Sequence, residues 1–371
     1  MSLSRRWRLA ALPLALLVAG CAGTAARPDS SSGPLPDRTP PPMARVVESF
    51  LTVPMPEHEI DSVAAWNLPD GGTWLIATGK ETNQLVVYDG NTGAMLRTIG
   101  EKGGAPGQFL RPNGIAVFGD TLFVVERDNH RVQLLELPSF RPLLQFGKGE
   151  LKSPYGLWLH ELAPRELELF VTDSFMADYR IQLAPPLDEL DQRVKRYRLD
   201  LRGATPTATL LEQFGDTSEE GALRMVESIA GDPVHDRLLV AEEDIRIGTT
   251  LREYRMDGSY TGRSLPPERF QAQAEGVALW ACADGSGYWI TADQNPDRTA
   301  FHVFDRQSLA FKGSFAGDHI AVTDGIWLHA VGTKAFPNGV LYVSHNDEGA
   351  GAFDWREIAK ALDLRPDCTS P

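Results

Sequence analysis

The sequence has few cysteines, few positive charges and no zinc-binding pattern, and each shortage excludes a class of protein. Three cysteines in 371 residues cannot form a disulfide framework, and no CxxC pair or histidine-rich tract is present. With 36 Lys and Arg against 50 Asp and Glu, the formal net charge of -14 leaves no basic surface that could hold nucleic acid by its phosphates. A metal bound by this chain must therefore be held mainly by oxygen ligands.

Catalytic motifs built on histidine are also missing. The eight histidines form neither the RHGxRxP motif of histidine phosphatases nor the HExxH motif of zinc hydrolases. The glycine-rich segment GEKGGAPGQF lacks the Lys-Ser or Lys-Thr ending of a phosphate-binding P-loop. Hydrolytic chemistry in this chain would have to depend on other side chains.

The N-terminal segment has the pattern of a signal for export. Three arginines precede an apolar run over residues 9–19 that is too short to span a bilayer, which predicts a signal peptide over 1–20. The sequence VAG before Cys21 resembles the lipobox of bacterial lipoproteins, which implies lipidation at Cys21; a plain secretory signal is the alternative. Because the next residue is not Asp, we expect the outer membrane of the cell envelope. Residues 21–44 are rich in Pro and Ser and predict a tether.

The rest of the chain contains an internal repeat. Short β-branched and aromatic runs are bounded by Gly, Asp, Asn and Pro, and a 3.6-residue apolar period is found only in WREIAKAL near the C-terminus. One unit recurs six times, with a small or acidic residue often followed by Gly, an alternating strand, a turn and a second apolar strand. The copies begin at Asp61, Asn113, Tyr155, Glu227, Glu275 and Asp324, with spacings of 52, 42, 72, 48 and 49 residues.

These spacings fit the roughly 40 to 50 residues of a four-stranded propeller blade, with one insertion in the longest interval. A third run such as QLVVYD or RVQLLEL follows most copies and adds a strand. We therefore predict an all-β, six-bladed β-propeller over residues 45–371, and expect it to be a monomer. An up-and-down barrel or a sandwich is the alternative. A closed ring buries both faces of each blade, which explains strands that are apolar on both sides.

Acidic residues recur at two positions of the last three copies. Glu227, Glu275 and Asp324 begin these copies, and the acidic residues that follow their second strands are Glu242, Glu243, Asp293 and Asp347. Carboxylates that point into one region repel each other unless a hard cation lies among them, and Ca²⁺ is the natural candidate. Taken singly, each acid fits a solvated strand end equally well.

Hydrogen-bond donors occupy the corresponding regions of the first three copies, namely Lys80, Arg127 and Tyr155. We expect them to face the carboxylates across the axis. A phosphate could then bridge metal ions on one side and accept hydrogen bonds from Lys and Arg on the other. Taken singly, Lys80 and Arg127 also fit solvated loops.

The second half of the chain resembles the β-propeller phytases, which are calcium-dependent enzymes that remove phosphates from inositol hexakisphosphate. The segments that resemble this family are ESIAGDPVHDRLLVAEEDI, EGVALWACADGSGYWITADQ, DGIWLHA, FPNGVLYVSHNDEG and FDWREIA. The resemblance covers most of residues 45–365, with weaker support before residue 150. It implies a calcium-dependent phosphomonoesterase of the 3-phytase type that hydrolyses phytate or a related polyanionic ester by metal-activated water.

Carried over residue by residue, the resemblance implies metal ligands and a phosphate pocket. The pair Glu227 and Glu243 looks like two calcium-ligating glutamates, Glu275 like a third carboxylate ligand, and Asp318 with Asp324 like an aspartate pair six positions apart. Glu243, Lys80, Arg127 and Tyr155 then form the implied catalytic set. Two positions depart from the family, because Gln273 stands where an aspartate is usual and Ser174 where a phosphate-binding lysine is frequent. They put one ligand and one cation in doubt.

Two other functions fit the sequence. The segment GAPGQFLRPNGIAVFGDTLFVVERDNHRVQLL is similar to NHL repeats, which implies a non-catalytic propeller that binds a protein or glycan. A calcium-dependent lactonase-like propeller would use a single metal and would not need Lys80 or Arg127. Cys282 and Cys368 remain after lipidation of Cys21 and could pair in an oxidising compartment, but the sequence does not give their distance.

Overall fold

The structure is a computed structural model that describes residues 43–367. The predicted signal peptide, the lipidated Cys21 and nearly all of the predicted tether lie outside the described residues. Within residues 43–367, no helix is long and apolar enough to cross a bilayer. Cys282 is disulfide-bonded, while Cys368, the partner considered from the sequence, lies outside the described part of the chain.

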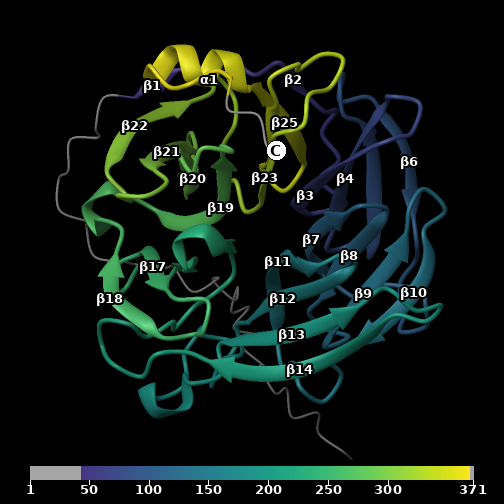
Figure 1. Cartoon of the computed structure of the whole chain (residues 1–371), viewed down its shortest axis with the longest axis vertical. Helices are drawn as coiled ribbons and strands as arrows, with labels where there is room; N and C mark the ends of the chain where they lie inside the picture. Colours follow the sequence, from purple (N-terminus) through teal and green to yellow (C-terminus); the bar gives the residue numbers. More distant parts are fainter. Residues whose placement is uncertain (1–42, 368–371) are drawn as a thin grey trace, which may run out of the picture. The chain divides into compact units, whose positions relative to one another are not determined.

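Six antiparallel sheets form the blades of a β-propeller, which confirms the predicted fold class (Figure 1). Blade 1 consists of β3 (Ile60–Asn67), β4 (Thr73–Gly79), β5 (Gln84–Asp89) and β6 (Met95–Ile99). Blade 2 consists of β7 (Pro112–Phe118), β8 (Thr121–Glu126), β9 (Arg131–Glu136) and β10 (Arg141–Phe146). Blade 3 consists of β11 (Pro154–Ala163), β12 (Glu166–Asp173), β13 (Val194–Asp200) and β14 (Thr207–Phe214).

The remaining blades follow the same order. Blade 4 consists of β15 (Ile229–Asp232), β16 (Arg237–Glu242), β17 (Thr250–Tyr254) and β18 (Tyr260–Ser264). Blade 5 consists of β19 (Gln273–Ala281), β20 (Gly287–Gln294), β21 (Ala300–Asp305) and β22 (Phe311–Ala316). Blade 6 contains β23 (Ile326–His329), β24 (Val340–His345) and β25 (Gly349–Asp354), followed by α1 (Trp355–Leu362).

The repeat copies found in the sequence coincide with the first two strands of the six blades. The third run QLVVYD is β5, RVQLLEL is β9 with the residue that follows it, and WREIAKAL is α1. The long insertion lies inside blade 3, between β12 and β13, and includes a short 3-10 helix, Leu187–Glu189.

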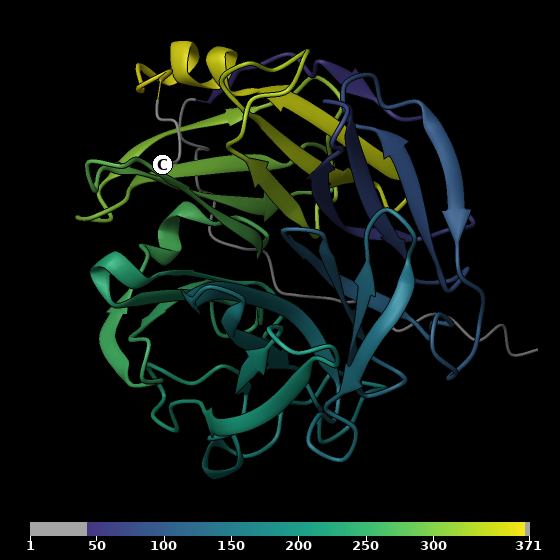
Figure 2. The same ribbon diagram turned by 45° about the vertical axis from the view of Figure 1, so that its right-hand side comes forward.

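The ring is closed by strands from the beginning of the described chain. Blade 6 takes its outer strand from β2 (Phe50–Leu51), which pairs antiparallel with β25. The short strand β1 (Ala44–Arg45) pairs parallel with β22 of blade 5. Figure 2 shows these N-terminal strands beside the C-terminal blade and α1. This closure was not predicted, because two-residue strands have no detectable period in the sequence.

The hydrophobic core is divided among the blade interfaces. Six buried clusters are present, and each joins the facing strands of two adjacent blades. At the interface of blades 5 and 6, for example, Trp280 stacks on Trp355 of α1 with ring centroids 3.9 Å apart. Burying both faces of each sheet in this way explains why the second strands are buried along nearly their whole length.

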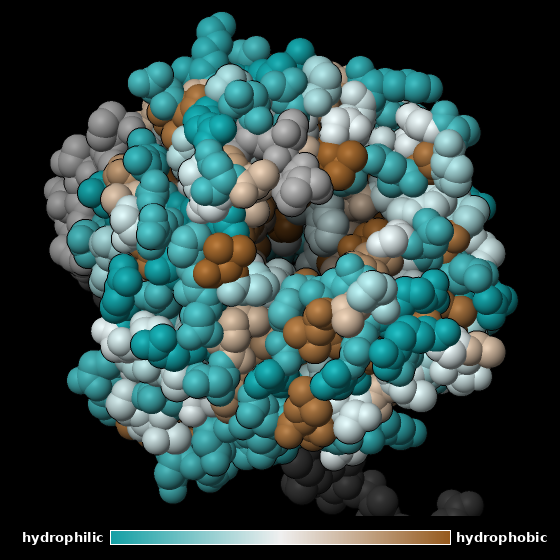
Figure 3. Space-filling view, in the orientation of Figure 1, coloured by the Kyte–Doolittle hydropathy of each residue, from teal (hydrophilic) through white to brown (hydrophobic). Residues whose placement is uncertain are grey.

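The inner strands β3, β7, β11, β15, β19 and β23 line an axial cavity of about 290 Å³. Because the blades share one strand order, these inner strands run in the same direction and their first residues gather at one mouth of the cavity. Figure 3 shows a hollow near the centre of the face in view. A side chain placed at the start of an inner strand therefore lies close to its counterparts from other blades.

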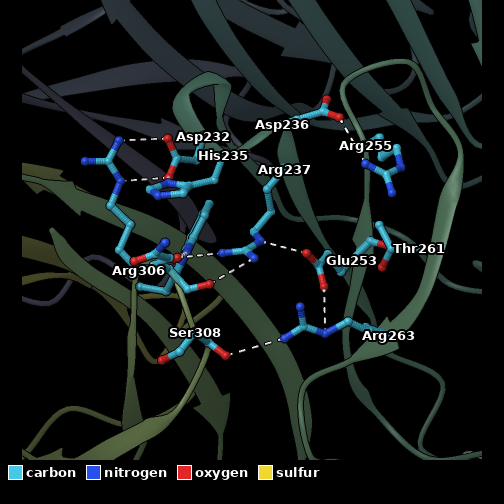
Figure 4. Close-up of polar contacts among 12 residues, drawn as sticks. Asp232, His235, Asp236, Arg237, Glu253, Arg255, Thr261, Arg263, Arg306 and Ser308 are labelled. Atoms are coloured by element: carbon cyan, nitrogen blue, oxygen red, sulfur yellow. Dashed lines mark hydrogen bonds and ion pairs between the residues drawn. The ribbon is translucent and has the colours of Figure 1, made fainter. Parts of the chain in front are cut away.

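A buried ionic network joins blades 4 and 5 at the other end of β15 (Figure 4). Arg306, which follows β21, donates to both carboxylate oxygens of Asp232 at 2.7 and 2.8 Å. Arg237 on β16 donates to Glu253 at 2.8 Å and to the carbonyl oxygen of Arg306 at 2.6 Å. Asp232 is fully buried and Arg306 is 4% exposed, so the two charges compensate each other in the interior, and His235 Nδ1 also lies 2.7 Å from Asp232 Oδ2.

We predict that Arg306→Met lowers the free energy of unfolding by about 3–5 kcal/mol, because it removes the guanidinium that binds both oxygens of the buried Asp232 carboxylate. The double variant Asp232→Leu with Arg306→Met should lose less, since no charge remains buried. Urea denaturation measures both. The matched control is Arg255→Met, which removes a half-exposed pair with Asp236 and should change stability by about 0–1 kcal/mol. Equal losses in Arg306→Met and Arg255→Met would contradict this assignment.

Candidate metal and phosphate site

The first residue of each repeat copy lies at the start of an inner strand, so that each blade supplies one side chain to the same mouth of the channel. In blade order these residues are Asp61, Asn113, Tyr155, Glu227, Glu275 and Asp324. Four of the six are acidic. The mouth is therefore a ring of mixed carboxylate, amide and phenol groups, made by residues far apart in the sequence.

β-Bulges place these side chains. In blades 1, 2, 3 and 5, the pairing between the inner strand and its neighbour shifts register at the ring residue and the position that follows it. A bulge releases a residue from the ladder and redirects its side chain, and bulges are common next to functional sites. The ring residues are thus turned out of their own sheets.

Close contact between neighbouring blades fixes the ring. A Cβ on Gly156 of blade 3 would overlap the carbonyl oxygen of Glu227 in blade 4, and a Cβ on Gly276 of blade 5 would lie 3.0 Å from the carbonyl oxygen of Asp324 in blade 6. Thr172 also donates to the carbonyl oxygen of Glu227 at 2.6 Å. The glycine that follows a ring residue is therefore required by packing against the next blade.

Three glutamates form a tight cluster in this mouth. Glu227, Glu243 and Glu275 each present one carboxylate oxygen, and these three oxygens lie within 4.8 Å of one another. Glu243 and Glu275 are 1% and 3% exposed, while Glu227 is partly exposed. Glu227 and Glu275 are ring residues, and Glu243 reaches the cluster from the loop after β16. The structure thus brings together three of the five predicted metal ligands.

The cluster strongly disfavours its own ionisation. Burial, reinforced by the negative charge of Asp61, raises the pKa of Glu227 to about 8. Burial and the charges of Glu227 and Glu275 hold the pKa of Glu243 well above its ordinary value. For Glu275, burial and the charges of Glu227 and Asp324 have the same effect on its pKa. Buried like charges of this kind can all ionise only when a cation compensates them.

Asp324, the fourth predicted ligand, borders the cluster. Its Oδ1 accepts a hydrogen bond from Gln294 Nε2 at 2.7 Å. Burial and the charge of Asp61 hold its pKa well above the ordinary value. Its other oxygen, Oδ2, and Oε1 of Glu243 are buried and have no hydrogen-bond partner among the described residues. Buried carboxylate oxygens without a partner are costly, and a hard divalent cation would satisfy both, so these donors fit Ca²⁺.

Lys80 lies among carboxylates instead of facing them across a gap. Its Nζ is 3.0 Å from Asp61, 3.3 Å from Glu59 and 3.9 Å from Asp347. Burial alone would lower the pKa of the Lys80 ammonium, but the charges of Asp61 and Asp324 outweigh it and raise that pKa. Lys80 is therefore a permanent cation inside the site. It lies among carboxylates, whereas the sequence led us to expect it across the axis from them.

Arg127 and Tyr155 form the side of the mouth contributed by blades 2 and 3. The charge of Glu227 and burial raise the pKa of the Tyr155 phenol, so this residue stays a neutral donor. Arg127 donates through Nε to Asp128 at 2.7 Å, and its side chain is 30% exposed. Both residues line one pocket with Glu227. The predicted donors are thus brought beside the acidic cluster.

Asp318 is the predicted ligand that lies elsewhere. Arg45 of β1 binds both of its carboxylate oxygens, at 2.6 and 2.5 Å, and this ion pair helps to hold β1 against blade 5. The assignment of Asp318 as a metal ligand is therefore not supported by its position. The sequence could not indicate this, because Arg45 is 273 positions away and precedes the first repeat copy.

Acidic residues at the ends of the second strands have a structural role. Glu242 is fully buried and accepts hydrogen bonds from the backbone N–H groups of Met225 and Asp244 at 3.2 and 3.0 Å. Asp293 likewise accepts from the N–H groups of Gln271 and Ala272 at 2.9 and 2.7 Å. These acids anchor loops to their blades, whereas Glu243, the next residue after Glu242, points into the cluster.

Sequence reasoning missed several members of the site. Asp61 and Asn113 begin repeat copies, so the repeat could have indicated them, but the recurring acidic pattern was recognised only in the last three copies. Asn113 is fully buried, and both polar atoms of its amide are without a partner among residues 43–367. Glu59 contacts Lys80 from just before β3, where no repeat signal marks it.

The comparisons with known proteins are limited to the fold. No family model and no curated protein sequence matches the chain. A solved structure of hydrazine synthase from Kuenenia stuttgartiensis aligns with a TM-score of 0.43 and 12% identity, over 91% of this chain and 87% of that chain. A chain of a nidogen/laminin complex aligns with a TM-score of 0.43 and 15% identity, over 71% of this chain and 82% of that chain. Similarity at this level carries no argument about function.

We predict that Gly156→Ala weakens metal binding, because the added methyl group displaces the backbone at Glu227. Its stability should fall by about 1–3 kcal/mol, as is usual for overpacking. Calcium titration by calorimetry and thermal unfolding measure the two effects. The control is Gly203→Ala, whose new methyl group would have its nearest neighbour at 3.5 Å and should change neither. Unchanged calcium affinity in Gly156→Ala would show that the inter-blade contact does not position the site.

A pH series tests the charge balance of the glutamate cluster. Between the ordinary glutamate value of about 4.3 and the raised value of about 8 for Glu227, the unfolded chain has lost a proton that the folded chain retains. The metal-free protein should therefore lose stability as the pH rises through this window. Because a cation displaces these protons, its affinity should increase over the same window. Melting temperatures in chelator and in calcium measure both trends, and parallel curves would contradict the prediction.

Proposed function

We propose that the protein is a calcium-dependent phosphomonoesterase that hydrolyses a polyanionic phosphate ester such as inositol hexakisphosphate. The observation that carries this proposal is the cluster of Glu227, Glu243 and Glu275, bordered by Asp324 and lying beside Lys80, Arg127 and Tyr155. Acids from the last three blades and donors from the first three blades thus lie close together, which supports the phosphate pocket that the resemblance to β-propeller phytases implies. The N-terminal sequence further supports attachment to a bacterial envelope through Cys21.

The acidic residues would hold the metal. Glu227, Glu243 and Glu275 are the proposed ligands, with Asp324 available through the oxygen that Gln294 does not bind. A bound Ca²⁺ supplies the positive charge that draws a phosphate to an acidic protein and favours attack by water on phosphorus. All-oxygen donors and the absence of a Cys or His ligand in this cluster favour calcium over softer metals.

The donors would position the phosphate and stabilise its charge. The Arg127 guanidinium is held by Asp128 yet partly exposed, so it can donate to phosphate oxygens. Tyr155 remains protonated and can donate a neutral hydrogen bond to the same group. Lys80 is shared by three carboxylates, so it chiefly orients Asp61 and Asp347 and keeps the mouth from becoming wholly anionic.

A phosphate-release assay on inositol hexakisphosphate, with calcium titrated from zero, tests this proposal. Glu243→Gln removes one anionic ligand at constant shape and should reduce calcium affinity by about tenfold or more. The same change should stabilise the metal-free protein at neutral pH, because the carboxyl group of Glu243 is buried and its pKa is raised. These opposite effects separate loss of a ligand from loss of the fold.

The control is Glu268→Gln, an exposed residue of the loop after β18, which should change neither activity nor stability. Phosphate release that persists in excess chelator would exclude the proposed enzyme. Arg127→Ala should abolish most phosphatase activity, whereas a lactone-hydrolysing activity insensitive to that change would favour the lactonase-like alternative. Absence of any turnover would favour a binding propeller.

A further inference from the structure

A second cavity of about 470 Å³ adjoins the glutamate cluster. Tyr155 and Glu227 belong to its wall, so it opens directly beside the proposed metal ligands. The remaining wall comes from the β8–β9 turn, the loop before β11, the long insertion of blade 3 and the loop before β15. If the phosphate group of an ester is held at Tyr155, the alcohol part of that ester would lie in this cavity.

Two kinds of side chain line the cavity. Arg127, Lys152 and His130 are cationic or polar, whereas Met176, Tyr179 and Met225 contribute thioether and phenol groups. Thioether and phenol groups pack well on flat apolar surfaces. Ser174, which also lines the cavity, adds no charge, and its hydroxyl oxygen accepts the N–H of Val226 at 3.2 Å. The cavity is therefore amphipathic and not uniformly cationic.

Hydrogen bonds fix the segments that carry the apolar side chains of the cavity. Arg193 is fully buried and donates to the carbonyl oxygens of Phe175 in the blade 3 insertion and of Leu223 in the loop before β15, at 2.5 and 2.9 Å. Arg246 donates to the carbonyl oxygen of Gln182 at 2.8 Å and ties the insertion to blade 4. These bonds hold the segments that contain Met176 and Met225 together before any ligand arrives.

The cationic residue Lys152 is also held in place. The Lys152 ammonium lies 4.0 Å from the centre of the Phe175 ring and donates to Gln192 at 3.0 Å. Its backbone N–H binds the carboxylate of Asp173, which is fully buried, and His130 Nδ1 lies 2.7 Å from the Lys152 carbonyl oxygen. Lys152 is thus presented at the rim with an aromatic ring behind it.

We infer that this cavity binds the alcohol part of the phosphate ester and that it accepts an alcohol with an apolar or aromatic face. The phosphate lies toward Tyr155 and Arg127, the flat face packs on Tyr179 and Met225, and the polar edge turns to Lys152. The inference rests on the proposed phosphomonoesterase function and extends its substrates to monophosphate esters of alcohols that have an apolar face.

The test compares phenyl phosphate with glycerol 2-phosphate in the calcium-loaded full chain. Tyr179 is 59% exposed, so its substitution should leave the fold intact. Tyr179→Ser should raise KM for phenyl phosphate about fivefold, the loss expected for one aromatic contact, and should change KM for glycerol 2-phosphate less than twofold. Tyr179→Phe should restore the wild-type KM. Leu162→Ser, an exposed apolar residue at the opposite end of β11, is the matched control.

Binding of phenylphosphonate, measured by calorimetry, separates this inference from the proposed reaction. If no ester is hydrolysed but Tyr179→Ser still weakens phenylphosphonate binding, the cavity assignment stands and the phosphatase proposal fails. If esters are hydrolysed but Tyr179→Ser changes both KM values equally, the cavity assignment is overturned and the phosphatase stands. Equal KM values for the two esters in the wild-type protein would also overturn it.

Discussion

The close contact between the start of one inner strand and the start of the next is the constraint on which the site depends. Gly156 and Gly276 leave no room for a side chain against the neighbouring blade, and Gly325 donates its N–H to the carbonyl oxygen of Asp61 at 3.1 Å, so the contact also spans the junction of blades 6 and 1. Since these glycines directly follow ring residues, the packing between blades also determines where the site residues lie. An ordinary core contact elsewhere in a blade could relax without moving a ring residue, whereas these contacts cannot.

The acidic cluster is the electrostatic counterpart of that geometry. The fold spends part of its stability in bringing Glu227, Glu243 and Glu275 together, because buried carboxylates that share one space resist ionisation. Lys80 forms ion pairs with Asp61, Glu59 and Asp347, and it forms none with the three glutamates among residues 43–367. The asymmetry leaves the three glutamates without an ion pair among the described residues, whereas Asp61 has the Lys80 ammonium at 3.0 Å. Acidic residues that look alike in the sequence thus have different roles, since Glu242 anchors a loop and the adjacent Glu243 does not.

Most of the fold was predictable from the sequence, and about half of the site. The repeat located the first two strands of every blade because alternation and turn residues are local properties. It also placed Glu227, Glu275 and Asp324 at equivalent positions, from which their proximity follows. The resemblance to β-propeller phytases, and not the repeat, implied Asp318 as a ligand, and its ion pair with the distant Arg45 was not predictable. The three carboxylate contacts of Lys80 were not predictable either, because they depend on how side chains pack after ring closure. The cavity beside Tyr155 was not predictable, because a long insertion without repeat character gives no information on where its side chains lie.

The pairing of β2 with β25 has a consequence for the order in which the molecule is assembled. Thr52 Oγ1 accepts a hydrogen bond from the N–H of Ala350, 298 positions along the chain, and contacts this far apart form late because they require closure of the longest loop. Blade 6 stays one strand short until that seam forms, and with it the junction of Asp324 and Asp61. A nascent chain therefore has no complete ring of mouth residues at any stage before its last blade is made, so the channel mouth as a whole is a property of the finished molecule alone.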